Sequence, residues 1–301
     1  MVVARAKSSM TMNELVELLG EYGQSNSVES IVRAGPYLEA LAHTFGDREV
    51  GSVRAKELHA FHRQICTSPA VSPLLALLEE KSQRWEAAYS RRAEGLVGCL
   101  QWESQQPVRA LVDLFEQKGL RPNRVLELGC GDGVNAVFMA SRGCEVTAVD
   151  LSHTALVMAR EKQRAARVDV EFVEGDIFEL EPSREPYDFI FDRGMFHHLQ
   201  VFQFEDYKNL VADRLTPDGY FHLICHHVSA RPTVLLDCLC GFVGMLLNFV
   251  SGILLEMGTG FTAEELREIF SDRFRFQSMD LIVDDNNRPF RFVSSVMQRI
   301  G

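Results

Sequence analysis

Two pairs of adjacent histidines, His197-His198 and His226-His227, follow apolar segments of the chain. Four of the nine histidines therefore lie in these two places. Neutral imidazole takes up a proton near physiological pH, which suits a base that removes a proton from a nucleophile. Asp192 precedes the first pair and adds a carboxylate. The residues predict a site that orients a nucleophile or removes its proton, with His197, His198, Asp192 and His226 as catalytic residues.

The same histidines allow two other interpretations. A metal ion would take its ligands from His197, His198, His226, His227 and Cys225. Because adjacent side chains of an extended chain point in different directions, such a site requires one histidine from each pair and an acid. In the third interpretation, a histidine caps a helix or packs against a bound cofactor. The sequence leaves these alternatives open, and we predict no metal site.

A second chemical signal is the segment 125–133, which reads VLELGCGDG. Its first half is an apolar run typical of a buried strand, and its second half contains Gly129, Gly131 and Gly133. Glycine allows a tight turn and a close approach to a ligand because it has no Cβ atom. A helix is predicted next, over 134–141, and its free N–H groups would point toward the turn. Strand, turn and helix in this order favour the binding of a nucleotide-type ligand.

The next predicted strand, 145–149, is followed by Asp150. This acid lies 21 residues after Gly129, where a doubly wound α/β unit places the carboxylate that binds ribose hydroxyls. An alternative is that Asp150 caps the next helix ahead of Leu151, a role that Ser152 fills equally well. Ribose binding explains the spacing of both motifs, so we favour it.

The charge of the first motif distinguishes between two kinds of cofactor. Dinucleotide sites use G-x-G-x-x-G and hold a pyrophosphate on the helix N-terminus. This chain has G-x-G-x-G, and Glu127 precedes it. A carboxylate there would repel a pyrophosphate but attract an ammonium and a sulfonium. The motif resembles the first motif of the class I S-adenosylmethionine-dependent methyltransferases, and the resemblance covers about residues 95–299.

This resemblance implies S-adenosyl-L-methionine as the cofactor and S-adenosyl-L-homocysteine as its product. It implies that Glu127 and the glycine turn contact the methionine part and that Asp150 holds the ribose. It also implies that Asp176 lies beside the adenine, with Ile177 packed on the ring. The predicted cofactor-binding residues are Glu127, Gly129, Cys130, Gly131, Asp150, Leu151, Asp176, Ile177 and Asp192.

Strands and helices alternate from about residue 105, which is typical of a parallel sheet. The sequence predicts an α/β fold with a doubly wound, mostly parallel seven-stranded sheet whose last strand is antiparallel. A closing hairpin of this kind is what the class I methyltransferases add to the sheet. A capping box, with Thr262 as N-cap, starts the helix before that hairpin. The expected strands are 124–128, 145–149, 169–173, 189–191, 220–225, 274–283 and 290–299, and the expected helices include 134–141, 152–166 and 204–215.

The rest of the chain is predicted to form two further parts. Residues 1–95 show helical periodicity only and predict an all-helical N-terminal domain, whereas residues 96–301 form the cofactor-binding domain. An apolar insertion lies at about 230–258, and its central part is long enough to suggest a membrane span. A membrane span in this insertion would separate the last two strands from their sheet. We therefore predict that the insertion forms a lid over the active site. A dimer contact and an interfacial membrane patch remain open.

Composition sets broad limits on the partners. The chain has 301 residues and a formal net charge of −11, which argues against nucleic acid as a substrate. No apolar run comes after the basic residues near the start, so no signal peptide is predicted. Seven cysteines without a disulfide-like framework suggest reduced thiols and a cytoplasmic protein. We expect no transmembrane span, and a homodimer through the helical domain or the apolar insertion remains open.

The segment directly after the fourth strand bears on the acceptor. Enzymes that methylate amino groups of nucleic acids carry an acid or amide followed by Pro-Pro and an aromatic residue there, whereas this chain has Asp192-Arg193-Gly194-Met195. A Trp- and Pro-containing segment before the first strand resembles the small-molecule thiol and thiopurine methyltransferases. We therefore predict a biosynthetic methyltransferase for a small, partly apolar molecule with an N, O or S acceptor. A cofactor-binding enzyme of other chemistry and a protein-interaction module remain alternatives. The predicted substrate-binding residues are Trp102, Arg193, Phe196 and His227.

Overall fold

The structure, a computed structural model, describes residues 11–14, 16, 17, 21, 35–48, 61, 83, 85–97, 100, 103–199, 203–227, 260–283 and 291–300. The chain divides into two compact units. The first comprises Met1–Glu80, Leu199–Glu205 and Val228–Gly260, and the second comprises Lys81–His198, Asp206–His227 and Phe261–Gly301. The division falls at Glu80, so residues 81–95, which the sequence analysis assigned to the N-terminal domain, belong to the second unit.

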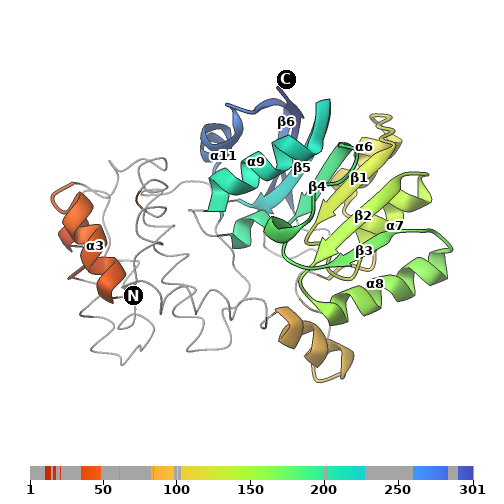
Figure 1. The fold of residues 1–301 in the computed structure, drawn as a ribbon, viewed down its shortest axis with the longest axis horizontal. Helices are drawn as coiled ribbons and strands as arrows, with labels where there is room; N and C mark the ends of the chain where they lie inside the picture. Colours follow the sequence, from red (N-terminus) through yellow and green to blue (C-terminus); the bar gives the residue numbers. More distant parts are fainter. Residues whose placement is uncertain are drawn as a thin grey trace. The chain divides into compact units, whose positions relative to one another are not determined.

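The second unit is built on a seven-stranded sheet with the strand order β3-β2-β1-β4-β5-β7-β6 (Figure 1). The strands β1 to β5 are parallel to one another, and β7 is antiparallel to both β5 and β6. This confirms the predicted fold class. The strands are β1 (Arg124–Leu128), β2 (Glu145–Asp150), β3 (Glu171–Glu174), β4 (Tyr187–Arg193), β5 (Leu215–His226), β6 (Phe274–Val283) and β7 (Arg291–Arg299).

Helices cover both faces of this sheet (Figure 1). On one face α6 (Arg109–Glu116), α7 (Val134–Ser141) and α8 (His153–Ala166) share a buried core with β1, β2 and β4. On the other face α9 (Phe204–Arg214) and α11 (Ala263–Phe270) pack through Tyr207 and Phe270 against Phe221 of β5. The strands therefore carry apolar side chains on both faces, as buried parallel strands do.

Local signals set the starts of two helices. The Ser152 hydroxyl accepts a hydrogen bond from the backbone N–H of Ala155 and caps α8. Thr262 and Glu265 form the predicted capping box at the start of α11. Each such cap stabilises a helix by about 0.5–2 kcal/mol. Both helices thus begin where the sequence predicted them to begin.

Several predictions concern parts of the chain that the structure does not describe. The apolar insertion 230–258 and Trp102 lie outside the described residues, as does the turn between β6 and β7. In the first unit the structure describes the helix α3 (Gly35–Phe45). Across the described residues, no helix is both long enough and apolar enough to cross a membrane.

Candidate functional site

The glycine turn after β1 adopts backbone conformations that require glycine. Gly129, Gly131 and Gly133 have φ angles of 67°, 53° and 75°. A Cβ atom at Gly129 would lie 2.7 Å from Cβ of Met195, and one at Gly133 would lie 2.7 Å from Cβ of Ala159. The turn is therefore held between the β4 end of the sheet and α8, and α7 begins directly after it.

Asp150, at the end of β2, holds this turn in place. Its Oδ2 accepts a hydrogen bond of 2.7 Å from the backbone N–H of Gly131, and its Oδ1 accepts one of 2.9 Å from the N–H of Ser152. Burial raises the pKa of Asp150. Because Ser152 provides the helix cap, Asp150 acts on the glycine turn, and the capping alternative considered for it is unnecessary.

Glu127 is a buried carboxylate whose hydrogen-bonding capacity is only partly used. Its side chain is 2% exposed, and its Oε1 lies 3.4 Å from Nδ2 of Asn135. Among the described residues, its Oε2 has no hydrogen-bond partner. Burial raises the pKa of Glu127 to about 8. A buried acid with an unpartnered oxygen beside a glycine turn fits a ligand that carries an ammonium group.

The residues predicted to border the adenine and the ribose lie at the ends of β2 and β3. Asp176 caps the short helix η3 (Ile177–Glu179) by accepting a hydrogen bond of 2.9 Å from the N–H of Phe178. Ile177 and Cys130 are buried, whereas Leu151 is 39% exposed. The structure brings these ends to the same edge of the sheet as Asp150, since the backbone N–H of Gly175 donates to the Asp150 carbonyl oxygen at 3.0 Å.

Asp192 lies near the end of β4, where the sequence places it. It is fully buried, and its oxygens accept hydrogen bonds from the N–H groups of Met195 (2.8 Å) and Phe196 (3.0 Å) and from the hydroxyl of Tyr207 (2.6 Å). Burial raises the pKa of Asp192 to about 7. With these donors around it, Asp192 fixes the turn between β4 and η4 (Phe196–His198).

Phe196 departs from its prediction as a substrate-binding residue. It is fully buried, and its ring packs against Phe261, Phe270 and Tyr207 with centroid distances of 4.9, 5.3 and 5.1 Å. These rings belong to the core between the sheet and the helices α9 and α11. The aromatic residue after β4 was predicted from its position in the sequence, but its side chain points into the core.

The structure brings three of the four predicted histidines together. The ring centroids of His197 and His198 are 4.4 Å apart, and those of His197 and His226 are 4.3 Å apart. His197 is 4% exposed, and its Nδ1 accepts a hydrogen bond of 3.3 Å from the backbone N–H of His226. In neutral His197 the proton is therefore on Nε2.

His227 is set apart by a bond to the backbone. Its Nδ1 lies 3.1 Å from the carbonyl oxygen of Phe261, which can only accept, so Nδ1 carries the proton. Within the described part of the chain, no group of histidines, cysteines and acids has a geometry that would hold a metal ion. Arg193 follows Asp192 at the end of β4 and is half-buried.

Sequence reasoning predicted helix throughout residues 1–95 but did not place the helical segment 85–93, here called the cap helix, beside the candidate site. Trp85 lies with its ring edge to the ring of His198, at a centroid distance of 4.8 Å. The Tyr89 hydroxyl lies beside the glycine turn, because a Cβ atom at Gly131 would be 2.5 Å from it. The spacing of Trp85 and Tyr89, four residues apart, indicates one helical face. It does not indicate which part of the fold that face covers.

The carboxylate of Glu86 fastens the cap helix to the start of α8. It accepts hydrogen bonds from the hydroxyl of Ser152 (2.7 Å), from the backbone N–H of Thr154 (3.1 Å) and from the Thr154 hydroxyl. Burial acts to raise the pKa of Glu86, but the hydrogen bonds from Thr154 and Ser152 outweigh it and lower the pKa to about 2. Glu86 therefore remains a carboxylate at all ordinary pH values.

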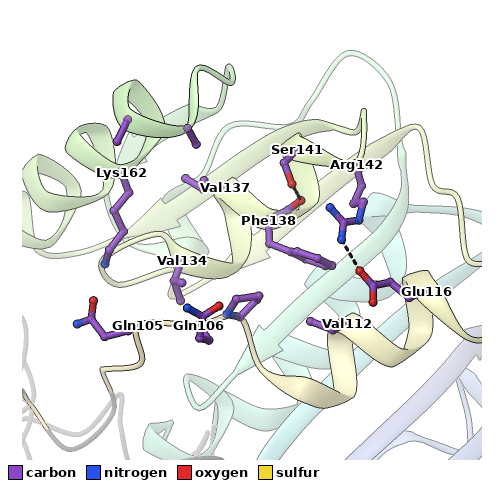
Figure 2. Close-up of a pocket in the computed structure, with 13 residues that line it drawn as sticks. Gln105, Gln106, Val112, Glu116, Val134, Val137, Phe138, Ser141, Arg142 and Lys162 are labelled. Carbon is purple, nitrogen blue, oxygen red and sulfur yellow. Dashed lines mark hydrogen bonds and ion pairs between the residues drawn. The ribbon is translucent and has the colours of Figure 1, made fainter.

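A separate pocket of about 560 Å³ lies among α6, α7 and α8 (Figure 2). Phe138 and Val112 form part of its apolar wall, and Arg142 and Glu116 make an ion pair at its rim. None of the site residues predicted from the sequence lines this pocket. The ammonium group of Lys162, another lining residue, is paired with Asp132 of the glycine turn.

Comparison with known proteins agrees with this geometry. Residues 125–219 match the family described as "Methyltransferase domain". The chain is similar to a ubiquinone biosynthesis O-methyltransferase of Alkalilimnicola ehrlichii (36% identity, 34% of this chain, 42% of that protein). It is also similar to a ribosomal RNA small subunit methyltransferase C of Chromohalobacter salexigens (31% identity, 38% of this chain, 34% of that protein). The chain thus matches less than half the length of either relative.

Among solved structures, the fold is similar to that of the 1,6-didemethyltoxoflavin-N1-methyltransferase of Burkholderia thailandensis, which was solved with bound 1,6-didemethyltoxoflavin and S-adenosylhomocysteine. The TM-score is 0.55 at 19% identity, and the match covers 76% of this chain and 90% of that one. The strand order defines a doubly wound α/β domain. Together with the match over residues 125–219, this fold resembles that of the class I S-adenosylmethionine-dependent methyltransferases, whose cofactor is S-adenosyl-L-methionine.

Proposed function

We propose that the protein transfers a methyl group from S-adenosylmethionine to an N, O or S atom of a small, partly apolar molecule. The observation that carries this proposal is the juxtaposition, at one edge of the sheet, of a buried acid and a histidine cluster. Glu127 and Asp192 lie on the adjacent strands β1 and β4, which pair in parallel. The contact between Gly129 and Met195 joins the glycine turn directly to the turn that carries the histidines.

The residues on the cofactor side fit the charges of S-adenosylmethionine. Glu127 would pair with the ammonium group, and Asp150 would accept hydrogen bonds from the ribose while it holds the glycine turn. Asp176, Ile177 and Leu151 would border the adenine. The cofactor supplies an activated methyl group on its sulfonium, so the chain's own residues need only align the acceptor and manage its proton.

The hydrogen bonds of the histidines support different roles for them. His197 would orient the acceptor through its Nε2–H, because its Nδ1 already accepts the N–H of His226. The base would then be His198 or His226, both of which are half-buried. Asp192 and Tyr207 would act at a distance from the acceptor by fixing the turn that carries His197 and His198.

A small acceptor is supported by the charge of the chain as well as by the histidines. The formal net charge of −11 disfavours a polyanionic substrate, because binding to phosphates requires a basic surface. One of the similar proteins is named as a ribosomal RNA methyltransferase, so RNA is the rival acceptor that a test has to exclude.

The test is to incubate the full chain with cofactor that is labelled on the methyl group and with a fractionated cell lysate. We expect label in the small-molecule fraction. Label in RNA or protein would overturn the proposed acceptor class, and bound cofactor without any transfer would overturn methyl transfer itself. Asp150→Ala should abolish labelling, whereas Asp169→Ala, which removes an exposed acid near the start of β3, should leave it unchanged.

A further inference from the structure

Five aromatic rings form a continuous row across the carboxyl ends of β4 and β5, here called the aromatic row. Neighbouring ring centroids are 4.8, 4.4, 4.3 and 4.7 Å apart, and the contacts are T-shaped or tilted. These distances lie in the range where aromatic rings attract one another. In order, the row comprises Trp85, His198, His197, His226 and Phe292.

The row is only partly covered. His197, at its centre, is buried, whereas Trp85, His198, His226 and Phe292 are each half-buried. Residues on both sides of the central histidine therefore keep part of their surface exposed. The row contains rings over its whole length and histidine nitrogens near its middle.

The cap helix connects this row to the cofactor side. Its residues Trp85 and Tyr89 touch His198 and the glycine turn respectively. Glu86, between them, is held by Ser152 and Thr154 at the start of α8. Because these three contacts lie within five residues of one helix, the position of the Trp85 ring is fixed relative to both the glycine turn and the histidines.

We propose that the aromatic row selects flat aromatic acceptors and that Trp85 is a specificity-determining residue of the site. This inference rests on the proposed function and narrows its substrate class to fused aromatic molecules with a hydroxyl, thiol or N–H group at the ring edge. Such a molecule packs against the rings and presents that group to the histidines. A saturated molecule of the same size gains apolar burial but loses the ring–ring contacts.

The first measurement compares two probes on the unmodified full chain. The probes are 2-naphthol and decahydro-2-naphthol, which share a skeleton and a hydroxyl group but differ in aromaticity. Their dissociation constants are measured by calorimetry in the presence of saturating S-adenosylhomocysteine. We expect 2-naphthol to bind at least about tenfold more tightly. Equal affinities, or no binding of either probe while S-adenosylhomocysteine binds, would overturn this inference and leave the proposed methyl transfer standing.

The second measurement assigns the preference to Trp85. Trp85→Ala should weaken 2-naphthol binding about tenfold and leave the affinity for decahydro-2-naphthol within about twofold, while Trp85→Phe should restore most of the loss. Phe276→Ala, at a half-buried ring on β6 outside the row, is the matched control and should change neither affinity. An equal loss for both probes in Trp85→Ala and Trp85→Phe would show that Trp85 only supports the fold. If Trp85→Ala also loses S-adenosylhomocysteine binding, the affinities of Trp85→Phe for the two probes alone decide whether Trp85 determines the preference.

Discussion

At the ends of β1 and β2 the candidate site consists of backbone turns and carboxylates, whereas at the ends of β4 and β5 it consists of rings. On the cofactor side, Asp150 binds backbone N–H groups and Glu127 keeps one oxygen without a partner among the described residues. On the acceptor side, His197 is held between His198 and His226. The first region is specified by charge and by glycine, and the second is specified by which side chains pack together. Methyl transfer needs both, because the cofactor is charged and the proposed acceptor is largely apolar.

The largest expected effect tests the backbone of the cofactor side. Gly129→Ala places a side chain at a φ of 67° and 2.7 Å from Cβ of Met195. We expect the dissociation constant for S-adenosylhomocysteine to rise about 100-fold, because left-handed strain and the clash both distort the turn. Gly143→Ala is the matched control, since Gly143 also has a positive φ (89°) but has open space around its Cβ position. If both variants bind equally well, the shape of the turn does not determine cofactor binding.

The next effect tests the charge of the cofactor side. The pKa of Glu127 is raised to about 8, so its neutral form prevails at pH 6 in the cofactor-free protein. The contribution of this neutral form to the free energy of unfolding is lost as the pH rises toward 8. A bound ammonium favours the carboxylate. The dissociation constant for S-adenosylhomocysteine should therefore fall about tenfold per pH unit between pH 6 and 7.5, where the α-amino group of the ligand remains protonated.

Glu127→Gln provides the control for this pH dependence. The variant should bind more weakly at pH 7.5, and its affinity should change little with pH. If the affinity of Glu127→Gln depends on pH as strongly as that of the unmodified protein, a group other than Glu127 causes the pH dependence. The expected difference in charge between the two sides of the site would then be absent.

The smallest effect on cofactor binding is expected on the acceptor side. Tyr207→Phe removes the 2.6 Å hydrogen bond to the buried carboxylate of Asp192. We expect the free energy of unfolding to fall by about 1.5–3 kcal/mol and kcat to fall about fivefold. The affinity for S-adenosylhomocysteine should change less than about threefold. Thermal unfolding, calorimetry and kcat measure the three quantities. A loss of cofactor affinity as large as that in Gly129→Ala would show that the two sides are not separable.

The sequence predicted the cofactor side in more detail than the acceptor side, and particular residues show why. Glycines at 129, 131 and 133 and the acids at 127 and 150 lie at or directly after strand ends, so the parallel sheet brings them to one edge. Asp192 and Phe196 also lie near a strand end, but Tyr207 buries the first and Phe261 covers the second. Position along a strand predicts which edge a residue occupies, but it does not predict which neighbour covers its side chain.

By itself, the sequence determined the order of the elements, the closing hairpin and the glycine turn with its two acids, because each depends on residues that are close together in the chain. Only the tertiary structure decided that Trp85, Glu86 and Tyr89 lie over the site. Glu86 reaches Ser152 and Thr154 across 66 and 68 residues, and no local periodicity encodes a contact at that distance. The tertiary structure likewise decided which histidine offers a proton, since the Nδ1 of His197 meets the backbone of another strand.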